Sequence, residues 1–174
     1  EAAKDYGFNS PFEEFAFALE LSRNGVNTVY PRAIYMTGRA QKTEQETGDD
    51  RRYTSLADLH CPDGEPAIRK GCDYVTIWGF WNGPDTLLAE YDGRFYRAIN
   101  AKRACTTKLI SSAQLEELTE LKAARMARGG FEDLNPKPDH LLISYDSAQN
   151  LVLDNTGKPE LRLCNFELVR RLPV

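Results

Sequence analysis

The residues best suited to chemistry lie in the last third of the chain, between Gly130 and Arg171. A first polar loop carries Asp133, Asn135 and His140, and a second polar segment carries Asn165 and Glu167. A carboxylate can accept a proton from an attacking hydroxyl, and carboxylate and amide oxygens bind hard cations such as Mg²⁺. These residue types therefore suit either general-base chemistry or a small oxygen-rich metal site.

The sequence around these residues predicts a rigid support for them. The apolar run Leu141-Leu142-Ile143 predicts a buried strand, Asn155-Thr156-Gly157 predicts a turn, and a second strand is expected within residues 160–168. Loops mounted on a hairpin often carry binding or catalytic groups. We therefore expect both polar segments at one edge of this hairpin.

Two segments of this stretch resemble the protein-kinase-like fold. Lys137-Pro138-Asp139-His140-Leu141-Leu142-Ile143 is similar to the end of the family's catalytic loop, and Leu163-Cys164-Asn165-Phe166-Glu167 is similar to its Asp-Phe-Gly segment. The resemblance implies ATP and Mg²⁺ as cofactors. It also implies catalytic-loop roles for Asp133 or Asn135, a position for His140 beside the phosphates and the metal, and a metal site at Asn165 and Glu167.

Several residues depart from the family pattern at positions that phosphoryl transfer requires. An ungapped alignment puts Asn135 at the catalytic Asp, whereas placing Asp133 there requires two extra residues before His140. Asn165 replaces the metal-binding Asp, although Glu167 or Asp139 could supply an oxygen ligand. Because phosphoryl transfer depends on metal ions that neutralise charge, this loss favours a pseudokinase, a binding or regulatory module.

Two alternatives stay open. The first is an active ATP-dependent phosphotransferase that uses Asp133 as its base. The second is an unrelated α+β protein-interaction domain, since Asp, Asn and Pro bend a chain for purely local reasons.

An N-terminal helix and strand are predicted over residues 10–36. Ser10, Pro11 and Glu13 have the spacing of a capping box, and Gly25 ends the helix. A face of Phe12, Phe15, Ala16 and Leu19 is expected, and Pro31 is expected at an edge or bulge of the strand. The resemblance gives Glu14, or Glu13, the role of the helix glutamate that orients phosphates, while Glu13 can equally be a cap and Glu14 a solvated residue.

Strands are predicted over residues 73–99. Residues 73–81 form the strongest strand pattern, and Asp92-Gly93 indicates a hairpin over 87–99. By resemblance, Trp81 would lie at the hinge that receives an adenine ring; the alternative is that Trp78, Phe80 and Trp81 are core aromatics. Residues 38–71 are polar and predict a surface insertion, with a short helix near 55–59.

A second long helix is predicted before the polar loop. Ser111 and Gln114 have capping-box spacing, Leu115, Leu118 and Leu121 share a face with Ala124 or Arg125, and Gly129-Gly130 ends the helix. With the hairpin that follows, this defines the segment 111–171. We therefore expect one α+β domain over residues 1–174, kinase-like but truncated or reduced, with two main helices and antiparallel strands.

Composition limits the classes of partner. The net charge is −4 and no broad basic face is apparent, so nucleic acid is not an expected partner. The four cysteines, at 61, 72, 105 and 164, lack metal-binding spacing and are expected to be free thiols. No apolar run approaches the length of a spanning helix, so we expect no membrane partner and a cytoplasmic location. Because the chain begins Glu-Ala-Ala, a missing upstream segment or a protein partner is expected, besides a nucleotide.

Overall fold

Serine caps begin the two longest helices in the computed structural model of the chain, which describes residues 2–37, 51–69, 72–81, 83 and 96–173. In α2 (Pro11–Arg23) and α5 (Ser112–Arg128), Ser10 and Ser111 accept hydrogen bonds from the N–H groups of Glu13 and Gln114, whose side chains bond back. Both predicted capping boxes are confirmed. Gly129 caps α5, and Gly130 turns the chain with a φ of 83°, a backbone conformation that favours glycine.

The buried face of α2 differs from the predicted one. Ala18 and Leu21 are buried, whereas Leu19 is 39% exposed and Ala16 is exposed. The helix contacts two surfaces, which a single apolar face could not predict. Phe12 and Phe15 contact the aromatic rings of the neighbouring strand β2, while Ala18 and Leu21 enter the core.

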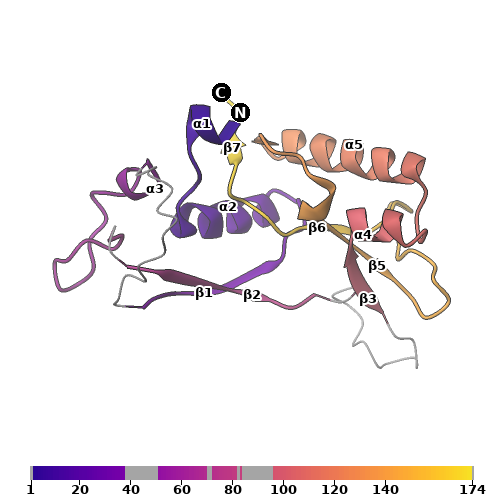
Figure 1. Cartoon of the computed structure of the whole chain (residues 1–174), viewed down its shortest axis with the longest axis horizontal. Coiled ribbons are helices and arrows are strands. Elements are labelled where there is room, and N and C mark those ends of the chain that lie inside the picture. Colours follow the sequence, from indigo (N-terminus) through magenta and orange to yellow (C-terminus); the bar gives the residue numbers. More distant parts are fainter. Residues whose placement is uncertain (1, 38–50, 70–71, 82, 84–95, 174) are drawn as a thin grey trace.

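Strands β1 (Tyr30–Met36) and β2 (Tyr74–Gly79) form an antiparallel two-stranded sheet. The register shifts between Pro31 and Ala33, which confirms the predicted bulge at the proline. Helix α2 lies along one face of this sheet (Figure 1). The sheet also leaves apolar side chains exposed, with Tyr35 at 58% and Val75 at 50%.

A second, three-stranded antiparallel sheet has the order β3-β5-β6, with β3 at Arg97–Asn100, β5 at Leu141–Tyr145 and β6 at Leu161–Leu163. The predicted hairpin of β5 and β6 is confirmed, and its turn is closed by Gly157 N–H donating to Asp154 O at 3.0 Å. Helix α4 (Ala101–Thr106) follows β3 directly and was not predicted. The predicted Asp92-Gly93 turn lies outside the described residues.

The polar loop is framed by a third pair of strands. Strand β4 (Phe131–Asp133) follows α5 and pairs antiparallel with β7 (Val169–Arg171), and a single 3-10 turn, η1 (Pro138–His140), leads into β5. Two short helices complete the described elements, α1 (Ala2–Tyr6) and α3 (Arg51–Thr54). The short helix predicted near 55–59 is therefore wrong in position. Residues 38–50 and 70–71 of the predicted polar insertion lie outside the described residues.

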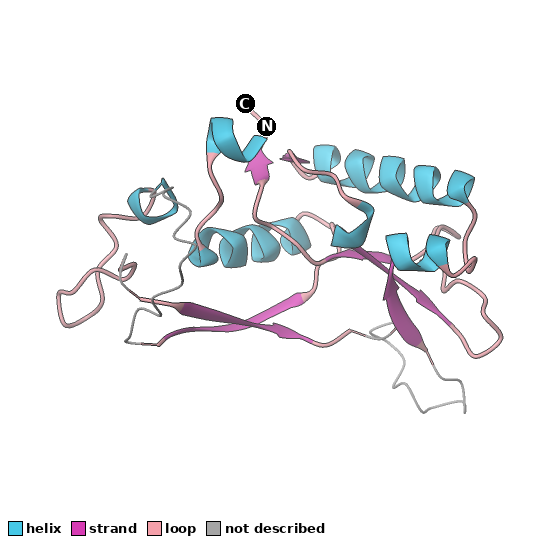
Figure 2. Ribbon diagram, viewed as in Figure 1, coloured by secondary structure: helices cyan, strands magenta, loops and turns pink. Residues whose placement is uncertain are grey.

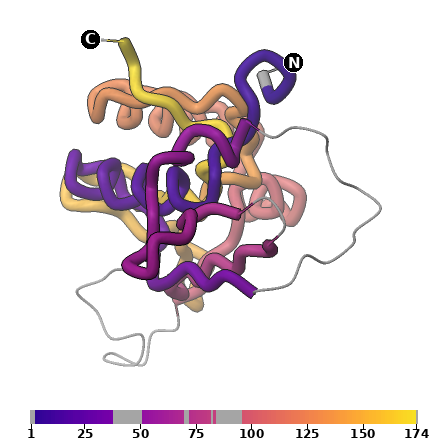
Figure 3. Tube along the Cα trace, turned by 90° about the vertical axis from the view of Figure 1, so that its left-hand side faces the viewer, coloured from indigo at the N-terminus to yellow at the C-terminus, as the bar shows by residue number. Residues whose placement is uncertain are grey.

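Two apolar clusters hold these elements together. The first joins α2, β4 and β7 through side chains that include Leu21, Phe131 and Phe166, and the second joins α4, α5 and the β5–β6 hairpin through Ala104, Leu118 and others. Seen from the side, α2 lies below α5 and above β1 (Figure 3). Helices α2, α4 and α5 thus lie on one side of the β1–β2 and β3–β5–β6 sheets, while the β4–β7 pair lies among the helices (Figure 2), an α+β arrangement as predicted. Among the described helices, none has the length and apolar character needed to cross a bilayer.

Candidate functional site

Asp133, the predicted base, is the last residue of β4 and takes part in a buried ion pair. Lys122 Nζ of α5 donates to Asp133 Oδ2 at 2.6 Å, and the two side chains are 2% and 7% exposed. The second oxygen, Oδ1, accepts the Asn135 N–H at 2.9 Å. Both carboxylate oxygens therefore already hold a donor from the protein itself.

Asn135 and His140 belong to the turns that follow Asp133. Asn135 is half-buried, and its carbonyl accepts the Lys137 N–H at 2.7 Å. His140 closes η1, and its carbonyl accepts the Cys164 N–H at 3.0 Å, which ties the first polar loop to the second. The structure thus brings the two polar segments side by side, as expected from the hairpin.

The His140 imidazole lies in a confined position. Its Nδ1 is buried and has no hydrogen-bond partner within the described part of the chain. Burial lowers the pKa of His140, and the charges of Asp133 and Asp139 oppose this shift. The ring is therefore disposed to be neutral.

The second polar segment forms a local turn over a buried ring. Asn165 Oδ1 accepts the Glu167 N–H at 3.2 Å, so the amide oxygen caps its own turn. Phe166, between them, is fully buried and stacks on Trp78 with ring centroids 5.2 Å apart. Asn9 fastens the same segment from outside, donating from Nδ2 to the carbonyl of Phe166 at 2.7 Å.

Glu14 and Glu167 form a pair of like charges between α2 and this segment. Burial is the main cause that raises the pKa of Glu14 to about 7, the Glu167 charge raises it further, and the nearby Arg52 charge opposes both. The sequence allowed Glu14 to be either a phosphate-orienting glutamate or a solvated helix residue. Its burial shows that Glu14 is not fully solvated. At neutral pH the carboxyl can hold or release a proton.

Trp81 is fixed by a different set of contacts. Its side chain is 4% exposed, and the guanidinium carbon of Arg162 in β6 lies 5.0 Å from the ring centroid. The indole Nε1 is buried without a partner in the described residues. A core position was the alternative for Trp78, Phe80 and Trp81. Trp81 is buried, Trp78 is half-buried against the core, and Phe80 is 85% exposed.

A metal site at Asn165 and Glu167 stays a prediction. Across the described ranges, no three His, Cys, Asp or Glu side chains are grouped so that they could hold a metal ion. The two predicted ligands would supply one amide and one carboxylate oxygen, which is enough for Mg²⁺ only when phosphates and waters complete its shell. ATP would have to bring those phosphates.

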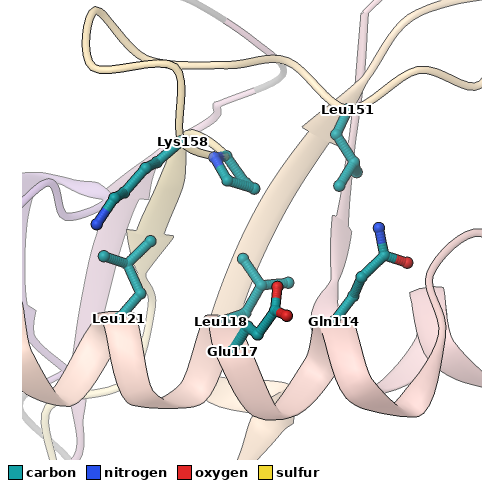
Figure 4. Close-up of a pocket in the computed structure, with 7 residues that line it drawn as sticks. Gln114, Glu117, Leu118, Leu121, Leu151 and Lys158 are labelled. Atoms are coloured by element: carbon teal, nitrogen blue, oxygen red, sulfur yellow. The ribbon is translucent and has the colours of Figure 1, made fainter.

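A cavity away from these residues lies between α5 and the segment that leads to β6. It has a volume of about 310 Å³, and its lining is mostly apolar, with Leu118, Leu121 and Leu151 among its residues. Figure 4 shows the side chains of α5 facing Leu151 and Lys158 across this space. None of the sequence-predicted site residues lines it. The cavity can accommodate a small apolar group.

Sequence reasoning missed Lys122, the partner of Asp133. The signal was present, because Lys122 lies four residues after Leu118 and four before Met126, and both neighbours are buried. A lysine in the middle of an apolar helix stripe requires a buried counter-charge. Asp133 is the acid that supplies it.

Comparison of the chain with protein-family models, with curated proteins and with solved structures returned no match. The geometry of the site is therefore the basis for any functional proposal.

Proposed function

We propose that this chain is a kinase-like binding or regulatory module that does not transfer phosphoryl groups. The observation that carries the proposal is the engagement of Asp133. Its two oxygens bind Lys122 Nζ and the Asn135 N–H, and only 7% of its side chain is exposed. A general base must come within hydrogen-bond reach of the hydroxyl it deprotonates, and this carboxylate has little surface left for one.

The second polar segment supports the same proposal. The Asn165 oxygen is used within its own turn, and an amide neutralises no charge on a metal. Glu167 lies close enough to Glu14 to raise its pKa, so a cation or a basic group there would relieve repulsion. The segment therefore lacks a carboxylate at the position of the family's metal-binding Asp, which favours a module that does not transfer phosphoryl groups.

The order of the elements also supports the proposal. A capped helix leads into a strand, a second long helix ends at glycines, and a polar loop then precedes a β-hairpin. This is the order in which the kinase-like family presents its regulatory helix and its catalytic loop. The antiparallel pairing of β4 with β7 places the ends of both polar segments beside each other, as a shared binding site requires.

The test is the thermal midpoint of the protein with ATP, with ATP and Mg²⁺, and with ATP and a chelator, together with a radiolabel assay for phosphoryl transfer. A ligand that binds only the folded state raises apparent stability, by about 2.7 kcal/mol at a hundredfold excess over its Kd. The proposal expects a rise with ATP that Mg²⁺ does not change, and no transfer.

Asn165→Asp should restore a metal dependence to this rise, and Asn27→Asp is the matched control because Asn27 is exposed outside the site. If the natural protein transfers phosphoryl groups and a folded Asp133→Asn variant does not, the chain is an active phosphotransferase instead. No rise with ATP under any condition would contradict the proposal and favour an interaction domain of another kind.

A further inference from the structure

A second cavity, lined by residues outside both polar segments, has two arginines and no acid in its lining. It lies beside the edge strand β3 and has a volume of about 480 Å³. Arg97 of β3 and Arg103 of α4 line it, together with Tyr145 and Gln149 from the end of β5 and the turn that follows. Two guanidinium groups at one cavity suit a doubly charged anion, because each can donate two parallel hydrogen bonds to phosphate oxygens.

The local charge favours an anion, although the whole chain is acidic. Residues 97–108 contain four basic residues, Arg97, Lys102, Arg103 and Lys108, and no acid. Neither arginine side chain makes an ion pair with any other described residue. The positive charge at this cavity is thus not cancelled by a partner within the described part of the chain.

The nearby acid, Asp146, is occupied in its own turn. Its Oδ1 accepts the N–H groups of Ala148 and Asn150, each at 2.9 Å. The carboxylate therefore organises the turn that carries Gln149. Its Oδ2 accepts the Asn150 side-chain amide at 3.3 Å.

Two left-handed backbone positions border the same cavity. Lys108 and Gln149 have φ values of 62° and 66°, and they are the non-glycine residues with positive φ in the described part of the chain. Gln149 lines the cavity, and Lys108 lies between the lining residues Thr107 and Leu109. Lys108 takes the left-handed position that ends helix α4, where the Leu109 N–H donates to the Ala104 carbonyl at 2.9 Å. The Gln149 N–H donates to the Asp146 carbonyl at 3.0 Å, so both conformations belong to local turns that shape the cavity wall.

The remaining wall determines the class of ligand. Ala98, Ile99 and Leu109 provide apolar surface, and Tyr145 and Gln149 supply a hydroxyl and an amide as neutral donors. We infer that this cavity binds a small organic phosphate monoester, with the phosphate held by Arg97 and Arg103 and the organic group against Ile99 and Leu109. This site is independent of the proposed nucleotide site.

The test is a titration of the whole chain with phenyl phosphate and, separately, with inorganic phosphate, followed by calorimetry and by backbone amide chemical shifts. Sodium chloride at matched ionic strength is the blank. We expect saturable shifts at Thr107, Tyr145 and Gln149, and tighter binding of phenyl phosphate because its ring adds apolar contact. Arg97→Gln with Arg103→Gln should weaken binding about tenfold or more, since charge-assisted hydrogen bonds are lost.

Arg128→Gln is the matched control, because Arg128 is also an exposed arginine in the last turn of a helix. It should leave both affinities unchanged. Equal weakening in the control, unchanged affinity in the double variant, or the same shifts with chloride alone would each overturn the assignment. Because Asp133 and Asn165 play no part in this cavity, variants at those positions distinguish its failure from that of the nucleotide proposal.

Discussion

The Glu14 carboxyl has a pKa of about 7, raised mainly by burial and further by the charge of Glu167. This shift makes the free energy of unfolding depend on pH. The folded protein holds this proton up to about pH 7, whereas the unfolded chain releases it near the ordinary value of 4.5. The folded state binds more protons between these values, so its stability falls as the pH rises from about 4.5 to about 7.

Glu14→Gln should remove this dependence. We expect the thermal midpoint of the natural protein to fall across that pH window and to level off at higher pH. At pH 8 the variant should be more stable relative to the natural protein than it is in acid. Glu117→Gln, an exposed position on α5, is the control and should keep the natural profile. A natural profile that stays flat from pH 4.5 to 7 would contradict the coupling.

Asp154 has the opposite behaviour. Burial would raise its pKa, but hydrogen bonds from Thr156, the Lys158 N–H and Arg125 outweigh burial and hold the pKa at about 2. The stability it contributes is present above the ordinary pKa of 3.8 and is lost as the pH falls through about 2.

Asp154→Asn should therefore cost about 1 to 3 kcal/mol of unfolding free energy at pH 7, because a charged group's hydrogen bonds are lost. The difference from the natural protein should shrink in acid, as measured by urea unfolding at pH 7 and near pH 2. Asp146→Asn, in the neighbouring turn, is the control, because it removes a turn aspartate and leaves the hydrogen bonds of Asp154 in place. An unchanged penalty in acid would show that the charge is not its cause.

Among the elements, α5 and β4 are joined by the buried Lys122–Asp133 pair. Removing one partner leaves an unpaired buried charge, which costs about 3 to 5 kcal/mol. We expect Lys122→Met and Asp133→Asn each to be strongly destabilising in chemical denaturation. The double variant should cost clearly less than the two losses added together, because no buried charge remains.

The exposed pair of Arg171 and Glu20, whose side chains are 62% and 37% exposed, is a matched control. Its coupling energy in the same kind of cycle should not exceed about 1 kcal/mol. Additive effects at Lys122 and Asp133 would mean that the two residues stabilise the protein separately.

The two capping boxes allow a comparison within one chain. Ser10→Ala and Ser111→Ala should each cost about 1 kcal/mol, with the larger loss at Ser10 because it is fully buried and Ser111 is exposed. Unfolding followed by circular dichroism measures both. Ser112→Ala, one residue inside α5, should have little effect, and a loss equal to that of Ser111→Ala would argue against capping.

Local signals explain which elements the sequence could predict. Caps, glycine stops and the proline bulge are encoded by neighbouring residues, so both long helices, β1 and the β5–β6 hairpin were predictable. Helix α4 was not, because Ala101 to Thr106 gives it fewer than two turns and no long apolar pattern. The buried face of α2 depends on contacts with distant residues, which a local pattern does not contain. Lys122, in contrast, had a local signal in the apolar stripe of α5.

For the whole molecule, Asn9 connects the first residues to the last strand. Its Nδ2 donates to the carbonyls of Phe166 and Val169, at 2.7 and 2.9 Å. Asn9→Ala should leave both carbonyls without this donor and loosen the segment under the second polar loop. We expect faster hydrogen exchange at the amides of Leu134 and Val169, which are bonded within this region.

Asn24→Ala is the control, because the Asn24 side chain also donates to a carbonyl, that of Gly129, but in an exposed position. Its effect should stay near the ends of α2 and α5. Unchanged exchange at Leu134 and Val169 in the Asn9 variant would mean that strand pairing alone holds the segment.

The same contacts set the order in which this molecule can fold. The bonds from Asn9 to Phe166 and Val169 join residues separated by 157 and 160 positions, and Arg170 donates back to Tyr6 across 164. Contacts so distant in sequence form late and slow folding, because a long loop must close first. During synthesis, the contacts of Asn9 with the second polar segment therefore cannot form until β7 has been made. Until then the apolar residues around Phe166 are exposed to chaperones and to aggregation.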